Sequence, residues 1–513
     1  MAVEGIQAAS RLGRLAAWIE NAPSQALATF LALHVALWAL IPALLQPNLP
    51  LDVVEQLAWG REWQWAYFKH PPLPAWTVEI VALLTHGWDR ALFFVGPLAS
   101  ALALYLIWRL ATDIVGQRLA LVAVLVQEGV LYFTFFTPEF NHNVIQVPLW
   151  ALIGWTARRS LIFGRIRDWI ILGLAAGLGM LGKYSTGLLL LALALFVLAE
   201  PGARRCLKTP GPWLALAAML LLLAPHIVVL GTVHYGPLDF PFERGTWAAH
   251  WPDHIVFPLQ FAGAQVLNLL PALLLLGVLL TSGQPDAKEV PRISAFDRHL
   301  AALLCFGPFL ISVAASAFLG LRFKDMWGAP FWDYVGLFAV VCLGREAPRP
   351  SERFLGLWAA IFLLGPIAYA AQFPGQALLD AKPLRGQFPG AELAAAVEAG
   401  WHRSQGGRPL RYVAGDVWYA GNIAFALWPE RPSVLIDGDR SKSPWVNESD
   451  LACHGLVLVW QGAGERDALL SRFPEAQQQR DIQLSYRTWN SQPSVRLGWA
   501  IVPPTATCDV AGS

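Results

Sequence analysis

The sequence predicts a mainly helical, multi-pass membrane protein that ends in a small α/β domain. Hydrophobic residues make up 56% of the 513-residue chain and charged residues only 14%, whereas about a quarter of the residues in soluble domains are charged. The shortage of charge is concentrated before residue 372, where long apolar runs follow one another. Beyond it the composition is more polar and short β-rich runs occur. We therefore expect a transmembrane domain over residues 1–372 and a second domain over residues 373–513.

The transmembrane domain is predicted from the length of its apolar segments. A transmembrane helix needs about 20 mainly apolar residues, and on that template we expect about eleven spans. They cover residues 26–45, 91–112, 119–136, 144–157, 169–181, 188–198, 213–233, 257–280, 300–319, 330–343 and 354–371.

Basic residues concentrate in every second loop between these segments. The pattern runs from Arg11 and Arg14 before the first span to Arg345, Arg349 and Arg353 after the tenth. Cytoplasmic loops are enriched in lysine and arginine, so we expect the N-terminus in the cytoplasm and a multi-pass protein of the cell inner membrane. The loop over residues 46–90 (the first outer loop) and the C-terminal domain then face the periplasm.

The C-terminal domain shows the alternation of helix and strand patterns that is typical of α/β folds. We expect a helix over residues 391–402 and strands over residues 410–414, 433–436, 455–460, 482–487 and 495–502. Cys453 and Cys508 both lie in this domain, and a periplasmic location would allow a disulfide between them. Two buried free thiols are the alternative.

Composition and motifs exclude several classes of function. A net charge of +1 provides no basic field of the kind that binds nucleic acid. The sequence holds no G-x-S-x-G, P-loop or G-x-G-x-x-G motif. No histidine and cysteine spacing fits zinc, and no loop is dense in carboxylates. The acidic residues could in principle hold a divalent ion, but we expect no cofactor.

The first outer loop carries two carboxylates, Asp52 and Glu55, three residues apart on one face of a predicted helix. We expect short helices over residues 53–65 and 73–85, broken by Pro71 and Pro72. A carboxylate beside an acceptor hydroxyl can act as a general base, so both residues are catalytic candidates. The alternative is a capping box in which Asp52 caps the helix and Glu55 closes the box.

Cations near the same outer face are candidates for binding a phosphate. Lys69 and His70 precede the rigid Pro-Pro pair, and Lys183 lies in a short turn between two apolar runs. Such groups stabilise charge as a bond to phosphate breaks. Further candidates are Arg244, Arg322 and Lys324. The alternatives are lysines that reach lipid headgroups and, for Lys183, a plain helical hairpin.

A second outer loop, over residues 137–143, links the third and fourth predicted spans. Its Glu139, Asn141 and Asn143 could bind sugar hydroxyls or orient the carboxylate of the first outer loop. Glu128 lies inside the third span, where an acidic residue is a functional candidate by default. We expect Lys183 or water as its partner.

These motifs together resemble the membrane glycosyltransferases of family 39/83, which have the GT-C fold. The resemblance covers residues 26–187 in the order of the motifs and the later spans in architecture: an acid four residues before Trp59, a Lys/His-Pro-Pro turn, a Thr-Pro-acid loop and a Gly-Lys-Tyr turn. The family has two acids in the first motif. Here Glu55 matches the second and Val54 replaces the first.

The resemblance implies a transferase that uses a polyprenyl-phosphate-linked sugar as donor. It implies displacement with inversion at the anomeric carbon, with Glu55 or Asp52 accepting the proton and Lys69, His70 and Lys183 holding the carrier phosphate. A lipid, glycan or protein would be the acceptor, and the C-terminal domain would cap the site or select that acceptor. A transporter or flippase of a lipid-linked glycan, and an inactive binding homologue, are the alternatives.

Overall fold

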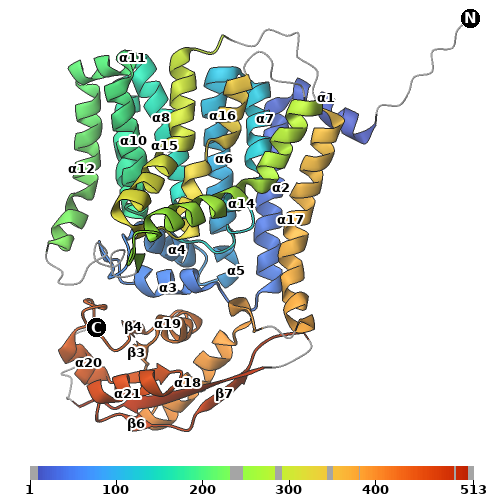
Figure 1. The fold of residues 1–513 in the computed structure, drawn as a ribbon. Helices are drawn as coiled ribbons and strands as arrows, with labels where there is room; N and C mark the ends of the chain where they lie inside the picture. The colour runs from blue at the N-terminus through green and yellow to red at the C-terminus, as the bar shows by residue number, and fades with distance from the viewer. Residues whose placement is uncertain are drawn as a thin grey trace, which may run out of the picture.

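The computed structural model describes residues 10–231, 246–282, 292–343, 350–379, 382–489 and 493–505. A bundle of long helices forms one layer and an α/β domain forms the other (Figure 1). Three short helices, α3 (Leu51–Gly60), α4 (Leu73–Leu84) and α5 (Asp89–Leu92), lie between them. The first outer loop therefore lies between the bundle and the C-terminal domain, away from the N-terminal helix α1 (Arg11–Asn21).

Each of the eleven apolar segments expected from the sequence is helical over most or part of its length. The helices are α2 (Pro23–Leu45), α6 (Val95–Val115), α7 (Gln117–Gln127), α8 (Gln146–Phe163), α9 (Ile166–Gly182), α10 (Thr186–Ala199), α12 (Gly211–Leu230), α14 (Asp253–Ser282), α15 (Ala295–Leu319), α16 (Val335–Leu343) and α17 (Glu352–Leu378). Shorter elements connect them: α11 (Pro201–Arg204), the 3₁₀ turns η1 (Leu131–Phe133), η2 (Arg205–Lys208) and η3 (Asp325–Trp332), and the strand pair β1 (Thr246–Trp247) and β2 (Leu321–Arg322).

Within the described residues, six helices are long and apolar enough to cross a membrane, or up to eight if each of two bent pairs is one span. The chain is thus a multi-pass membrane protein, but the expected count of about eleven spans is not confirmed. One bent pair is η3 with α16, which meet at 43° and divide the segment predicted over residues 330–343.

The third predicted span ends early, at Gln127, where the chain turns at Glu128 and Gly129. Gly129 packs so closely on α14 that a Cβ atom would lie 2.6 Å from the backbone nitrogen of Ala272. The Glu128 carboxylate pairs with His34 Nδ1 at 3.0 Å, and both side chains are fully buried. The expected partner of Glu128, Lys183 or water, was therefore wrong, because packing of α2 on α7 brings His34 to it.

The C-terminal domain has a mixed sheet covered by helices. Its strands are β3 (Tyr412–Gly415), β4 (Ser433–Ile436), β5 (Leu456–Trp460), β6 (Gln477–Gln478), β7 (Ile482–Ser485) and β8 (Ser494–Val502). The order is β4-β3-β5-β8-β6, and β7 pairs with β8. Strands β3, β4 and β5 are parallel and β8 is antiparallel to β5. The helices are α18 (Gly390–Gln405), α19 (Val417–Ala426), α20 (Glu448–His454) and α21 (Ala463–Arg472), after the turn η5 (Arg385–Gln387).

The C-terminal domain and the first outer loop share a hydrophobic core. One cluster of buried residues joins Trp59 and Tyr67 of the loop to Trp401 and Ile423 of the domain. Helix α17 continues to Leu378, past the expected boundary at residue 372. Burial of large apolar side chains across the junction stabilises one relative placement of the two parts.

Candidate active site

Helix α3 presents Glu55 to the Lys-His-Pro-Pro turn. The ammonium of Lys69 donates a hydrogen bond to Glu55 Oε1 at 2.6 Å, and Glu55 is only 8% exposed. Burial raises the pKa of Glu55, while the nearby Lys69 opposes that shift. A carboxylate with a raised pKa is better suited to accepting a proton than an exposed one.

The capping role considered for Asp52 is wrong. Pro50 is the N-cap of α3, no side chain caps the helix, and Asp52 lies within its first turn. Glu55 likewise closes no capping box, because it pairs with Lys69. Neither carboxylate therefore caps the helix.

The packing of Val54 gives a reason for an apolar residue at this position of the acidic motif. Val54 is 1% exposed and packs on α19, where a Cβ atom on Gly421 would lie 2.8 Å from Val54 Cγ1. Position 54 therefore belongs to the interface with the C-terminal domain. Glu55, the next residue on the helix, turns to Lys69 instead.

Glu139 of the second outer loop lies beside the start of α3. Burial raises the pKa of Glu139, the Asp52 carboxylate raises it further, and Arg385 acts in the opposite direction. Asn141 has a local role, since its Oδ1 accepts hydrogen bonds from the backbone N–H groups of Asn143 and Val144. This turn shapes the loop that carries Glu139.

Lys183 lies in the turn between α9 and α10 and contacts the second outer loop. Its Nζ donates to Asn143 Oδ1 at 2.5 Å and lies 5.6 Å from the centre of the Trp327 ring. Burial lowers the pKa of Lys183 to about 7, while Asp52 acts in the opposite direction. The negative charge of Asp52 thus raises the pKa of Lys183 as well as those of Glu55 and Glu139.

The imidazole rings of His70 and His142 lie against each other beside these groups, with their planes tilted by 33°. Their centroids are 3.8 Å apart, and the Trp59 ring lies 6.2 Å from His70 and 6.3 Å from His142. The charges of Lys69 and Lys183 both lower the pKa of His142. The structure thus places the following candidate residues near one another: Glu55, Asp52, Lys69, His70, Glu139, Asn143 and Lys183.

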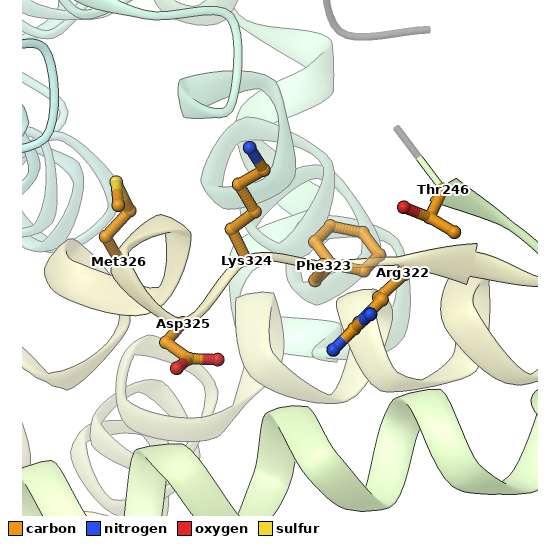
Figure 2. A pocket seen from close by; sticks show the side chains of 6 residues that line it. All are labelled: Thr246, Arg322, Phe323, Lys324, Asp325 and Met326. Carbon is orange, nitrogen blue, oxygen red and sulfur yellow. The ribbon is translucent and has the colours of Figure 1, made fainter. Parts of the chain in front are cut away.

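A pocket of about 300 Å³ lies along the segment that leads to Trp327 (Figure 2). It is lined by Thr246, Arg322, Phe323, Lys324, Asp325 and Met326. The Phe323 ring lies 5.8 Å from Trp327, the residue that Lys183 faces. Lys324 and Arg322 both line the pocket, and they extend to opposite sides of their segment.

Two further expectations fall outside the described residues. Arg244 lies between residues 231 and 246, and Cys508 lies beyond residue 505, so neither the phosphate contact nor the disulfide with Cys453 can be placed. Among the described cysteines, Cys206, Cys305 and Cys342 are free thiols.

Sequence reasoning missed the contribution of the C-terminal domain. Asp416 follows β3, and its side chain caps α19 by accepting a hydrogen bond from the Trp418 N–H. Its negative charge also raises the pKa of Glu55. Lys442 Nζ lies 5.7 Å from the centre of the Phe68 ring, and Lys69 Nζ lies 5.1 Å from the centre of the same ring. Arg385 and His142 were also missed. These residues are far from Glu55 in the chain, so no local pattern indicates them, although His142 lies within a loop that the sequence did single out.

Comparisons with known proteins bear on the family and the fold of the chain. A family model described as dolichyl-phosphate-mannose-protein mannosyltransferase matches residues 69–229. No curated protein sequence matches the chain. The family match over these residues and the fold shared with the solved structures below agree with the resemblance inferred from the sequence.

Two solved structures show the likeness in detail. The crystal structure of ArnT from Cupriavidus metallidurans bound to undecaprenyl phosphate has 13% identity and a TM-score of 0.59, covering 94% of this chain and 98% of that one. The apo state of the same protein has 13% identity and a TM-score of 0.57 with the same coverage. At this identity the likeness establishes the fold.

Proposed function

We propose that this protein transfers a sugar from a polyprenyl-phosphate-linked donor to a hydroxyl of a lipid, glycan or protein acceptor. The observation that carries the proposal is the meeting of a buried carboxylate, Glu55, with Lys69 at 2.6 Å, in a cluster that also contains Lys183. A carboxylate beside cations suits a reaction in which a hydroxyl loses a proton while a phosphate departs. Undecaprenyl phosphate bound to ArnT supports the same class of carrier.

The proposed reaction is a single displacement at the anomeric carbon of the donor sugar. The acceptor oxygen forms the new glycosidic bond as Glu55 takes its proton, and the bond between the sugar and the phosphate oxygen breaks. The polyprenyl phosphate leaves with the electron pair of that bond, and Lys69 and Lys183 stabilise its charge. Attack from the face opposite the leaving group inverts the configuration.

Asp52 and Glu139 are proposed to assist on the acceptor side. The negative charge of Asp52 raises the pKa of Glu55, Glu139 and Lys183. It therefore affects the protonation of both the proposed base and a proposed phosphate-binding lysine. His70, Asn143 and Lys324 are proposed substrate contacts from the surrounding wall. The C-terminal domain brings Asp416 and Lys442 to the same side and is proposed to select the acceptor.

The orientation follows the charge of the loops. The first outer loop and the C-terminal domain lie at one end of the bundle and α11 lies at the other (Figure 1). Arg204, Arg205 and Lys208 lie at the α11 end. Because basic loops remain in the cytoplasm, we propose that the site faces the periplasm from the inner membrane.

The direct test is transfer by the purified protein in detergent. The protein is incubated with a polyprenyl-phosphate sugar and an envelope glycolipid fraction, and mass spectrometry follows the new glycosidic product and the released polyprenyl phosphate. Formation of both in equal amounts supports the proposal. Movement of the donor across liposomes without a new bond would identify a transporter instead.

Polyprenyl phosphate is expected to bind more weakly as the pH rises from about 7 to about 9. The Lys183 ammonium, whose pKa is lowered to about 7, then loses its proton, whereas the phosphate is already doubly charged above about pH 6. A bound anion raises the pKa of Lys183, so affinity is lost above the pKa of the free protein, by up to about tenfold per pH unit. Calorimetric titration at several pH values measures this slope.

Lys183→Met separates this lysine from other titrating groups such as Glu139. The variant should bind weakly at every pH and lose most of the slope. Lys208→Met removes an exposed lysine at the α11 end and should bind as the wild type does. A slope that survives in Lys183→Met would assign the pH dependence to another group.

Treatment with EDTA is expected to leave the transfer rate unchanged. Among the described residues no group of three or more histidine, cysteine, aspartate and glutamate side chains is arranged to hold a metal ion. Lys69 and Lys183 already supply positive charge where a phosphate would leave. Loss of transfer with EDTA, restored by added Mg²⁺ or Mn²⁺, would contradict this expectation.

A further inference from the structure

His142 is a buried histidine of the candidate site to which the sequence assigned no role. The residue is 6% exposed and directly precedes Asn143, the partner of Lys183. Its ring lies against that of His70, with centroids 3.8 Å apart and planes tilted by 33°, and makes an edge contact with the Trp59 ring at 6.3 Å. Packing on these rings fixes the direction of its two ring nitrogens.

One of those nitrogens, Nε2, is buried and has no hydrogen-bond partner among the described residues. A buried polar atom without a partner costs free energy of about 1–3 kcal/mol, so such atoms in a folded protein call for an explanation. A substrate atom that completes the hydrogen bond is one, and the location of His142 in the cluster of Glu55, Lys69 and Lys183 favours it.

His142 is also electrically neutral. Burial, together with the charges of Lys183 and Lys69, lowers its pKa to about 3. A neutral imidazole carries a proton on one nitrogen and can donate one hydrogen bond there. It adds a directed donor to a place where two ammonium groups already supply charge.

We propose that Nε2–H of His142 donates a hydrogen bond to a phosphate oxygen of the lipid-linked sugar donor. The inference rests on the proposed function and names a specific contact within it. The phosphate is favoured over the acceptor because His142 directly precedes Asn143, which accepts a hydrogen bond from Lys183, and because the charges of Lys183 and Lys69 both act on His142. An anion is drawn to the lysine side, and phosphate oxygens accept hydrogen bonds.

Two substitutions separate a hydrogen bond from packing. His142→Phe keeps an aromatic ring to stack on His70 and removes the donor. His142→Gln removes the ring and places an amide N–H donor near the position of Nε2. If the hydrogen bond is the function, His142→Gln should bind polyprenyl phosphate better than His142→Phe, and packing alone predicts the reverse order.

The experiment measures binding of a long-chain polyprenyl phosphate to the full-length protein in detergent, with kcat and KM for transfer measured in parallel. His142→Phe should weaken binding about 10- to 100-fold, the usual value of a hydrogen bond to a charged group, and should lower kcat as well. His142→Gln should recover part of both. Thermal melting of each variant shows whether the fold is retained.

The outcomes distinguish this inference from the proposed function. If wild-type protein binds polyprenyl phosphate and His142→Phe binds it equally well, the inference fails and the proposed function stands. If His142→Phe loses affinity for the sugar-linked donor but not for polyprenyl phosphate, the contact is to the sugar and the assignment to phosphate fails. If the wild type binds neither ligand, the proposed function itself fails.

Discussion

Glu55→Gln is expected to abolish sugar transfer while the protein still folds. The substitution keeps the shape of the side chain but removes the group that accepts the proton of the acceptor hydroxyl. General-base catalysis contributes about 10²- to 10⁴-fold to rates, so kcat should fall by at least two orders of magnitude. Affinity for polyprenyl phosphate should change much less, because Lys69 and Lys183 remain. Initial rates with a polyprenyl-phosphate sugar and calorimetric binding of the carrier measure both quantities.

Glu448→Gln is the matched control for this prediction. Glu448 lies at the start of α20, is largely exposed and pairs with Arg440 away from the site. The control variant should transfer sugar at the wild-type rate. Near-full activity of Glu55→Gln would remove Glu55 as the base, and an inactive Asp52→Asn with active Glu55→Gln would move the role to Asp52.

Arg431→Ala is expected to destabilise the junction between the C-terminal domain and the first outer loop. The Arg431 guanidinium binds both carboxylate oxygens of Glu79, one at 3.0 Å, and their side chains are 7% and 2% exposed. Arg431 also lies 4.5 Å from the Trp428 ring centre. Removing one partner of a buried ion pair leaves an uncompensated charge and costs about 3–5 kcal/mol. Thermal and denaturant unfolding in detergent measure this loss.

The double variant Glu79→Leu with Arg431→Met tests the physical reason. If the cost comes from the unpaired Glu79 carboxylate, replacing both groups by apolar side chains should recover most of the stability. Arg466→Ala, on exposed helix α21, is the control and should change stability little. Equal destabilisation in the single and double variants would show that packing on Trp428, and not charge, holds the junction.

The fold class followed directly from local patterns in the sequence. Long apolar segments predicted the long helices of the bundle, and the strand patterns predicted five of the six strands of the C-terminal sheet, with β4 at its predicted bounds Ser433–Ile436. Hydrophobic runs and alternation act over short distances, so they can be read without knowledge of the contacts. The number of spans could not be read in this way, because bends such as that between η3 and α16 depend on packing.

The site was predicted in part, through residues that lie in the outer loops. Glu55, Lys69 and Lys183 were identified as polar groups between apolar segments, where charge requires a reason. Their hydrogen-bond partners could not be predicted from the sequence: Lys69 binds Glu55, and Lys183 binds Asn143. The partner of Glu128 was predicted wrongly, because no sequence pattern connects it to His34 in another helix.

By itself the sequence determined that this chain is a multi-pass membrane protein with charged outer loops and a terminal α/β domain, because burial of apolar segments in lipid depends on composition and length alone. Only the tertiary structure decided that Val54 faces the C-terminal domain while Glu55 faces Lys69. It also brought Asp416, Arg385 and His142 to the same cluster. Such a cluster is assembled by packing between distant segments, and packing energies have no signature in the local sequence.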